Sequence, residues 1–445
     1  MLDMKANQTI KSEFKLLTSK YKREDALSLF DLGKPKESVR YNPLLRGSGT
    51  ELKDKFMLTF NWSEEYYKKK AESFMLIVFN AVAKIRDKKG VLLTLNDVLN
   101  LLIDPDNILS LCGQLPSQSE NLINDLNVLH EQLSGFKEER KSLAGLKTDI
   151  EVMVKSTLGP MICSNDSIDI ADIIENEKVL LLSLDGQRFG STAARIARLL
   201  VADIRSYSGE VISSIDDFTP PEFTLMIDEF ADVVSTKEFG EVFTNLLNRS
   251  RSSGIGCIIS HQSIGDFEDE RIKSQIIDNT ETTFCFLQKD SDTAEKVARM
   301  IGTRQIFKST YRHKKELFYS KNTGDSSVRE TEEFIIHPNR IKDLSLGECA
   351  YFAKKPNRSG ILNVNHIKEP KVKSSRSKKN LVGFRKQYAP YSKVVLPGSE
   401  SGLTTTEKNN NLENQYDNST DLECESTRYV VNKVASTLTL GRADR

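Results

Sequence analysis

Two adjacent carboxylates follow an apolar run in the segment PPEFTLMIDEF, residues 220–230. The run predicts a buried strand, and Asp228 and Glu229 then lie at its carboxyl end, where open α/β sheets bind ligands. In a nucleotide hydrolase, a carboxylate in the first position holds hydrated Mg²⁺, and one in the second polarises the attacking water. Two acidic residues that simply cap a strand give the same pattern, so the pair needs support from its surroundings.

A second polar group surrounds the next apolar run, in NRSRSSGIGCIISHQS at residues 248–263. The amide of Gln262 is suited to hydrogen-bond a terminal phosphate or the attacking water. Arg251, with Arg249 as second choice, precedes the run and could serve as an arginine finger in a neighbouring subunit. The alternatives are a loop amide and two solvated arginines. His261 is interpreted as a packed residue at a strand end rather than a base.

The elements that must position these residues alternate between strands and helices over residues 166–301. Apolar runs and amphipathic periodicity predict strands at 178–184, 223–227, 255–260 and 283–287, and helices at 191–206, 237–250 and 292–301. Asp292 and Glu295 have capping-box spacing at the start of the last helix. Continuous apolar strands covered by helices imply a parallel α/β sheet of P-loop or Rossmann type, to which residues 305–365 add edge strands.

Residues 62–165 differ, because they show helical periodicity without β-alternation. Pro105 and Pro116 separate the apolar stretches. We therefore predict an all-α domain of ordinary size between the start of the chain and the α/β region.

Composition excludes several classes of protein. The 445 residues are 38% hydrophobic, with 63 Lys+Arg and 63 Asp+Glu, which excludes a chain disordered throughout and a uniformly basic nucleic-acid binder. No apolar run approaches the ~18 residues that span a bilayer, and the N-terminus lacks the apolar core of a signal peptide. Six cysteines without a C-x-x-C pair and five dispersed histidines argue against a disulfide framework or a zinc site and indicate a reducing, cytoplasmic setting.

Charge is concentrated near the C-terminus, where residues 371–445 are predicted to form a mostly disordered tail. Residues 371–399 carry eight basic residues and no acid, and residues 400–445 have a net charge of −3. Interleaved Phe384, Tyr388 and Tyr391 suit base stacking beside contacts to a nucleic-acid backbone, although a solvated linker has the same composition. The basic candidates for nucleic-acid binding are Lys371, Lys373, Arg376, Lys378, Lys379, Arg385 and Lys386.

These segments, in this order, resemble the TraG/TraD family of type IV secretion coupling proteins, which are hexameric RecA-like ATPases related to the FtsK/HerA DNA pumps. The resemblance also rests on Tyr41-Asn42-Pro43-Leu44, on residues 276–302 and on IKDLSLGECAYF at 341–352. It implies a RecA-like P-loop NTPase fold divided between residues 1–61 and 166–370, with the all-α domain at 62–165 as an insertion and the tail at 371–445.

The resemblance also implies roles for the residues above. Asp228 would bind Mg²⁺ through water, Glu229 would be the catalytic carboxylate, Gln262 the γ-phosphate sensor and Arg251 the finger acting in trans. ATP and Mg²⁺ are the implied cofactors. The implied partners are single-stranded DNA, relaxase and other relaxosome proteins, and the secretion channel, reached by a homo-hexamer at the cytoplasmic face of the bacterial inner membrane.

The phosphate-binding loop of such ATPases does not occur in this sequence. There is no G-x-x-x-x-G-K-[ST] motif, and the one Gly-Lys pair, Gly33-Lys34, is followed by Pro35. The opening LDMKAN resembles the family's strand after that loop, with Ala6 where the family has glycine. We therefore expect the chain to begin downstream of the P-loop.

Two explanations for the missing loop remain open: a split coupling protein whose upstream half carries the P-loop, and a degenerate homologue. Either would be inactive alone, because most contacts to the phosphates are lost. Two other functions also remain open, a non-catalytic adaptor for relaxosome proteins and a fragment of a general FtsK/HerA-like DNA pump.

Overall fold

The computed structural model describes residues 1–62, 64–213, 221–234, 236–267, 269–316 and 319–365, apart from the side chains of 264 and 310–327. Its centre is a parallel five-stranded sheet in the order β2-β3-β1-β4-β5. The strands are β1 (Leu2–Asp3), β2 (Leu27–Asp31), β3 (Val179–Ser183), β4 (Phe223–Asp228) and β5 (Ile255–Ile259). The predicted α/β fold is confirmed, and three of the predicted strands agree closely with β3, β4 and β5.

The shortest strand, β1, lies in the middle of the sheet. Leu2 is the register partner of Leu182 in β3 and of Ile227 in β4, and all three side chains are buried. Asp3 is likewise the register partner of Asp228. Residues at the start of the chain are therefore held between strands that lie far away in sequence.

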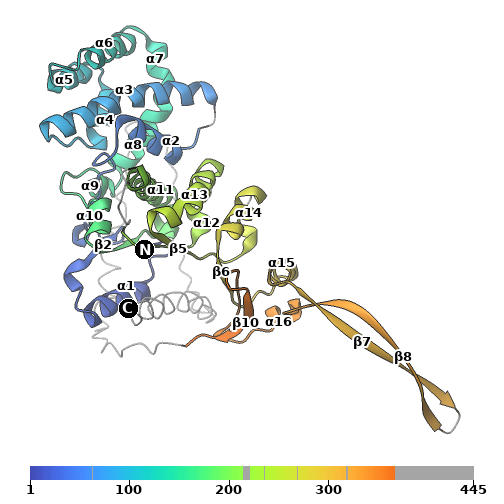
Figure 1. The fold of residues 1–445 in the computed structure, drawn as a ribbon. Coiled ribbons are helices and arrows are strands. Elements are labelled where there is room, and N and C mark those ends of the chain that lie inside the picture. The colour runs from blue at the N-terminus through green and yellow to red at the C-terminus, as the bar shows by residue number, and fades with distance from the viewer. Residues whose placement is uncertain (63, 214–220, 235, 268, 317–318, 366–445) are drawn as a thin grey trace, which may run out of the picture. The chain divides into compact units, whose positions relative to one another are not determined.

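Helices between the strands cover the sheet (Figure 1). The helix α11 (Gly186–Ser213) follows β3, α13 (Lys237–Ser250) follows β4, and α14 (Glu270–Asn279) follows β5. The helix α13 packs on β5, α14 and α11 and has the predicted bounds, whereas α11 is longer at both ends than predicted and changes direction at Gly190, whose φ is 44°. The other helices around the sheet are α1 (Gln8–Lys20), α10 (Ile170–Glu175) and the short α12 (Phe230–Val233).

Residues 65–162 contain helices and no strand. They are α3 (Glu65–Lys89), α4 (Leu95–Ile103), α5 (Asp106–Gln114), α6 (Glu120–Gly135), α7 (Lys137–Ser142), α8 (Ala144–Lys155) and α9 (Gly159–Ile162). The preceding helix α2 (Gly49–Thr59) packs along α3 and begins with a capping box between Ser48 and Glu51. The apolar stretch predicted to be helical supplies the buried side of α3, including Phe74 and Phe79. The predicted domain boundaries stay predictions.

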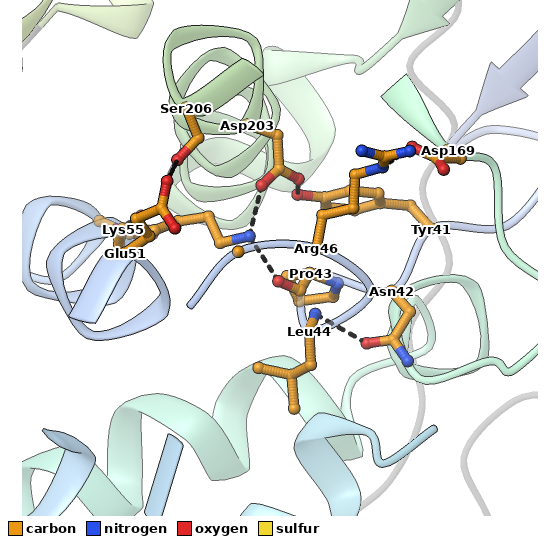
Figure 2. A network of polar contacts seen from close by, with 12 residues as sticks. Tyr41, Asn42, Pro43, Leu44, Arg46, Glu51, Lys55, Asp169, Asp203 and Ser206 are labelled. Atoms are coloured by element: carbon orange, nitrogen blue, oxygen red, sulfur yellow. Dashed lines mark hydrogen bonds and ion pairs between the residues drawn. The ribbon is translucent and has the colours of Figure 1, made fainter. Parts of the chain in front are cut away.

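A buried polar network joins α2, α11 and the loop before α2 (Figure 2). Lys55 of α2 forms a close ion pair with Asp203 of α11 and donates a hydrogen bond to the Pro43 carbonyl. The Tyr41 hydroxyl donates to the other oxygen of Asp203. Asn42 accepts a hydrogen bond from the Leu44 backbone at 2.9 Å. The tetrapeptide at 41–44 is therefore a structural junction between the α/β region and α2.

The strand predicted at residues 283–287 exists but lies outside the parallel sheet. The strand β6 (Thr282–Cys285) pairs antiparallel with β9 (Glu348–Ala353), in a three-stranded sheet completed by β10 (Arg358–Asn363). The expectation that residues 305–365 add edge strands to the parallel sheet is also wrong. Most of the strand residues there form an antiparallel hairpin of β7 (Thr303–Glu316) and β8 (Tyr319–Phe334). Local periodicity identifies a strand but not its partner.

The helix α15 (Ser291–Ile301) begins slightly earlier than predicted. Its N-cap is Asp290, whose side chain accepts a hydrogen bond from the Thr293 backbone at 2.8 Å, so the predicted capping role of Asp292 is wrong. The helix α16 (Pro338–Lys342) follows the hairpin. Contacts divide the chain into two units, residues 1–343 with 350–360, and residues 344–349 with 361–445. The predicted tail at 371–445 lies outside the described residues.

Candidate active site at the carboxyl edge of the parallel sheet

The carboxyl ends of the five strands form a polar edge. The residues that end the strands, or directly follow them, are Asp3, Asp31, Ser183, Asp228 and Ser260. On β2, Asp31 forms a buried ion pair with Lys11 of α1, with 2.7 Å between the ammonium and the carboxylate. The apolar strands thus deliver several carboxylates to one edge, as parallel pairing requires.

Asp228 ends β4 and is almost completely buried, with 6% of its surface exposed. Its Oδ1 accepts a hydrogen bond from the Ser260 hydroxyl at 2.5 Å. Its Oδ2 is buried and has no hydrogen-bond partner among the described residues. A buried carboxylate oxygen without a donor is costly unless a further group satisfies it. Asp228 is therefore suited to a water molecule of a hydrated cation.

Glu229 follows in the left-handed region of backbone space, with φ 55° and ψ 54°. This conformation is uncommon for a residue with a Cβ. The turn is held by Phe230, whose N–H donates to the Ser260 carbonyl at 2.8 Å and whose side chain is fully buried. The chain therefore turns sharply between β4 and α12.

Lys5 contacts Glu229, with 2.7 Å between the Lys5 Nζ and the Glu229 Oε2. The Lys5 side chain is 33% exposed and that of Glu229 13%. Burial favours the neutral amine, but the hydrogen bond and charge of Glu229, with the nearby charges of Asp228 and Asp232, outweigh it and hold the pKa of Lys5 above its ordinary value. The ion pair was not predicted from the sequence, although both residues follow polar strand ends.

Asp3 lies beside Asp228 on the neighbouring strand, and both are buried. Burial raises the pKa of Asp3 to about 6, with a smaller contribution in the same direction from the charge of Asp228. The backbone N–H groups of Asn7, at 2.8 Å, and Lys5, at 3.0 Å, donate to its carboxylate and oppose this shift. Asp3 was not predicted from the sequence to be a site residue.

The other predicted residues fall on both ends of β5. Gln262 lies two residues after Ser260, at the same edge as Asp228, and is exposed. Arg249 and Arg251 lie before β5 and are also exposed, so the length of the strand, about 16 Å for five residues, separates them from that edge. The structure thus brings Asp228, Glu229 and Gln262 to one edge and leaves both arginines at the other.

His261 is a packed residue, as predicted. Its Nδ1 lies 2.9 Å from the Ser263 carbonyl, and its ring lies edge-on to Phe267. Burial lowers its pKa. The basic residues predicted to bind nucleic acid lie outside the described residues.

Two features are absent from the described residues. No group of three or more His, Cys, Asp or Glu side chains there is arranged to hold a metal ion, so a cation at Asp228 would need water or ligand oxygens in addition. None of the helices in the described ranges is both long and apolar enough to cross a membrane.

Comparison with known proteins identifies the α/β region. Residues 222–345, which include Asp228, Glu229, Arg251 and Gln262, match the family model described as "TraM recognition site of TraD and TraG". This segment is of the TraG/TraD type. The resemblance inferred from the sequence motifs is thereby confirmed, while no curated protein sequence matches the chain.

Solved structures of a conjugative coupling protein share the fold of this chain. The bacterial conjugative coupling protein TrwBdeltaN70 in an unbound monoclinic form matches with a TM-score of 0.55 and 12% identity, over 78% of this chain and 75% of that chain. The plasmid coupling protein TrwB with the GTP analogue GDPNP matches with a TM-score of 0.53 and 12% identity, over 78% of this chain and 75% of that chain. TrwB with ADP and Mg²⁺ matches with a TM-score of 0.50 and 11% identity, over 78% of this chain and 75% of that chain. At these identities the likeness shows a common RecA-like fold.

Proposed function

We propose that this chain is the motor portion of a conjugative type IV secretion coupling protein, which couples ATP hydrolysis to the transfer of single-stranded DNA with its relaxase. The observation that carries the proposal is the adjacent pair Asp228 and Glu229 at the carboxyl end of β4, beside Ser260 and Gln262 at the end of β5, in a TraG/TraD-type RecA-like fold. TrwB is a plasmid coupling protein of that fold and binds nucleotide with Mg²⁺.

The geometry of each residue supports its proposed role. The partnerless Oδ2 of buried Asp228 fits a water ligand of Mg²⁺. The Mg²⁺ would neutralise charge on the phosphates of ATP. Glu229, whose carboxylate leaves the strand at a turn, would orient the attacking water and accept its proton. Exposed Gln262 would hydrogen-bond the terminal phosphate from the next strand.

Arg251 would act in the site of a neighbouring subunit. It is exposed and lies at the opposite end of β5 from Asp228, so a role in its own site would require a reach longer than an arginine side chain. A trans role requires a ring, and we propose a homo-hexamer, with Arg249 as the alternative finger.

The residues present do not make a complete nucleotide site, because the sequence has no phosphate-binding loop. We propose that an upstream P-loop-containing segment supplies it. The strand β5 is one of the two outer strands of the described parallel sheet, so its outer edge offers a place where a further strand could pair. Tight binding of ATP would need both parts.

The missing loop also favours a second candidate function, a non-catalytic adaptor that binds relaxosome proteins. In this function Asp228 and Glu229 would be structural, and partner binding would not depend on nucleotide. Co-purification with relaxase that is unchanged in a Glu229→Gln variant, together with no hydrolysis under any condition, would favour the adaptor over the motor.

Nucleotide binding and hydrolysis by the purified chain, with and without a P-loop-bearing segment supplied in trans, test the motor. We expect weak binding and background hydrolysis by the chain alone, and a gain of both when the segment is added. Glu229→Gln should keep the gained binding and lose the hydrolysis. Hydrolysis by the chain alone at rates typical of enzymes, about 10 s⁻¹, would contradict this division of the site.

The proposed partners are single-stranded DNA, relaxosome proteins and the secretion channel at the cytoplasmic face of the inner membrane. For DNA, the basic residues at 371–399 are the candidates. Deleting them should weaken binding to single-stranded DNA most at low salt, because lost phosphate contacts reduce the dependence on salt. Unchanged binding at low salt would remove this segment from the DNA-binding surface.

A further inference from the structure

The contact between Lys5 and Glu229 is built from backbone on both sides. Before Lys5, the Met4 carbonyl accepts a hydrogen bond from the Gly186 N–H at 2.6 Å. The Lys5 N–H donates to the buried carboxylate of Asp3. After Lys5, Ala6 turns the chain with a φ of 53°. The main chain of Lys5 is thus fixed at the end of β1.

Glu229 is fixed in a similar way at the end of the neighbouring strand. Its own φ of 55° turns the chain out of β4. The next residue, buried Phe230, donates its N–H to the Ser260 carbonyl at the end of β5. Because Asp3 and Asp228 are register partners, the residues that follow them leave the sheet side by side. Two backbone turns of uncommon geometry therefore bring an ammonium and a carboxylate to 2.7 Å.

Lys5 also faces more negative charge than one carboxylate. The charges of Asp228 and Asp232 act on it in addition to that of Glu229. Another lysine near this edge, Lys11, is held in its ion pair with Asp31. Without Lys5, the negative charges of Asp228, Glu229 and Asp232 would lose the positive charge on which all three act, and like charges near one another repel.

We propose that Lys5 is a positioning residue for Glu229, holding its carboxylate at the carboxyl edge of the sheet and supplying positive charge to the cluster of Asp228, Glu229 and Asp232. This inference rests on the proposed role of Glu229 as the residue that orients water. Lys5 itself touches neither nucleotide nor water in this role. It sets the direction of the Glu229 side chain and limits how strongly the cluster attracts a divalent cation.

Mn²⁺ alone, followed by electron paramagnetic resonance, tests the charge on the purified full-length chain. We expect Lys5→Met to bind Mn²⁺ about fivefold more tightly than the wild type, because one positive charge is removed beside three carboxylates. Lys5→Arg keeps the charge and should stay within about twofold of the wild type. Lys15→Met, which removes an exposed lysine on α1, is the matched control, and a Lys5→Met/Glu229→Gln double variant should lose the gain.

Hydrogen exchange of the same variants tests the positioning. Lys5→Met should speed amide exchange in residues 229–234 about tenfold, Lys5→Arg should restore slow exchange, and Lys15→Met should leave it unchanged. Glu229→Gln, which leaves Lys5 in place, should speed exchange in residues 4–7 if the pair holds both turns. These variants keep a measurable outcome even where Lys5→Met folds poorly.

The proposal is overturned if Lys5→Met matches Lys15→Met in Mn²⁺ affinity, or if exchange at 229–234 is the same in both. Rescue of both readouts by Lys5→Arg supports it, because a role in packing alone would not depend on charge. Neither measurement uses nucleotide. A chain that passes both tests but never hydrolyses ATP, even with a P-loop-bearing segment, would therefore contradict the motor function and leave the role of Lys5 intact.

Discussion

Asp3 and Asp228 are register partners on the adjacent parallel strands β1 and β4, and both carboxylates are buried. Only Asp3 is held by two backbone N–H groups, whereas Asp228 accepts one hydroxyl and keeps one oxygen without a partner among the described residues. Two neighbouring acids therefore differ in what they can do. Asp3 is committed to the fold, and Asp228 is available to a ligand.

The pKa of Asp3 predicts a pH dependence of stability. Burial raises this pKa from 3.8 to about 6 in the folded chain, so the folded state binds the proton more tightly than the unfolded state. The contribution of this tighter proton binding to the free energy of unfolding is present in full below about pH 4, and it is lost as the pH rises through about 6. Asp3→Asn removes this dependence, so the free energy of unfolding of the variant relative to the wild type should rise by about 2 kcal/mol between pH 4 and pH 7.

Urea unfolding at both pH values measures the difference. Asp25→Asn is the control, because Asp25 is exposed in a short turn and its replacement should give no such change. A constant difference between Asp3→Asn and the wild type across this range would contradict the raised pKa.

The ion pair between Lys55 and Asp203 predicts strong coupling between two distant segments. The Lys55 side chain is 5% exposed and that of Asp203 13%, and burial raises the pKa of Asp203 although Lys55 and Tyr41 oppose it. Lys55→Met leaves a buried carboxylate without its cation and should cost about 3–5 kcal/mol. The Lys55→Met/Asp203→Leu double variant should recover most of this loss, because both desolvated charges are gone.

A double-mutant cycle by chemical unfolding gives the coupling energy. Lys69→Met, at an exposed pair with Glu65 in α3, should change stability by less than about 0.5 kcal/mol. A cost for the double variant equal to the sum of the single costs would mean that the two residues act independently.

Replacing two helical glycines, Gly49 and Gly145, by alanine should change the stability of the chain in opposite directions. A Cβ added at Gly49, the first residue of α2, would lie 2.6 Å from backbone atoms of Asn80 in α3. Backbone cannot move aside as a side chain can, so Gly49→Ala should cost about 2–3 kcal/mol by forcing α2 away from α3. In Gly145→Ala on α8, the new Cβ meets nothing within 4 Å, and the better helix former should stabilise the chain by about 0.5–1 kcal/mol.

Thermal unfolding of the two variants side by side checks this. Both replace glycine by alanine in a helix, so their difference isolates the close approach of α2 and α3. Equal effects of the two substitutions would show that α2 and α3 do not pack as closely as the structure has them.

The sequence predicted those parts of the site that are local. Asp228 and Glu229 can be predicted because the apolar run of a buried strand ends directly before them. The helix α13 can be predicted because its apolar residues recur at helical spacing. The contact of Lys5 with Glu229 and the place of β1 in the sheet could not be predicted in this way, since each joins residues about 180 or more positions apart. The same reason applies to Lys55 and Asp203, which are 148 positions apart, and to β6, whose periodicity does not name β9 as its partner.

The backbone conformation of Ala6, at the edge of the site, predicts that one substitution there stabilises the chain. Its φ of 53° lies in the left-handed region, where a Cβ costs roughly 1–2 kcal/mol. Glycine avoids that cost but loses more conformational freedom on folding, which offsets part of the gain. Ala6→Gly should therefore raise the free energy of unfolding by about 0.5–1 kcal/mol. Ala144→Gly, at the exposed start of α8, is the control and should lower it by a similar amount.

The same variant tests whether the turn after Lys5 is set by the fold or by the residue. If the fold imposes the left-handed turn, Ala6→Gly keeps the Lys5–Glu229 contact, and hydrogen exchange at residues 229–234 stays as slow as in the wild type. Urea unfolding and exchange on one sample measure both quantities. A destabilised Ala6→Gly variant would contradict the backbone geometry at Ala6, because glycine is the residue that this geometry favours most.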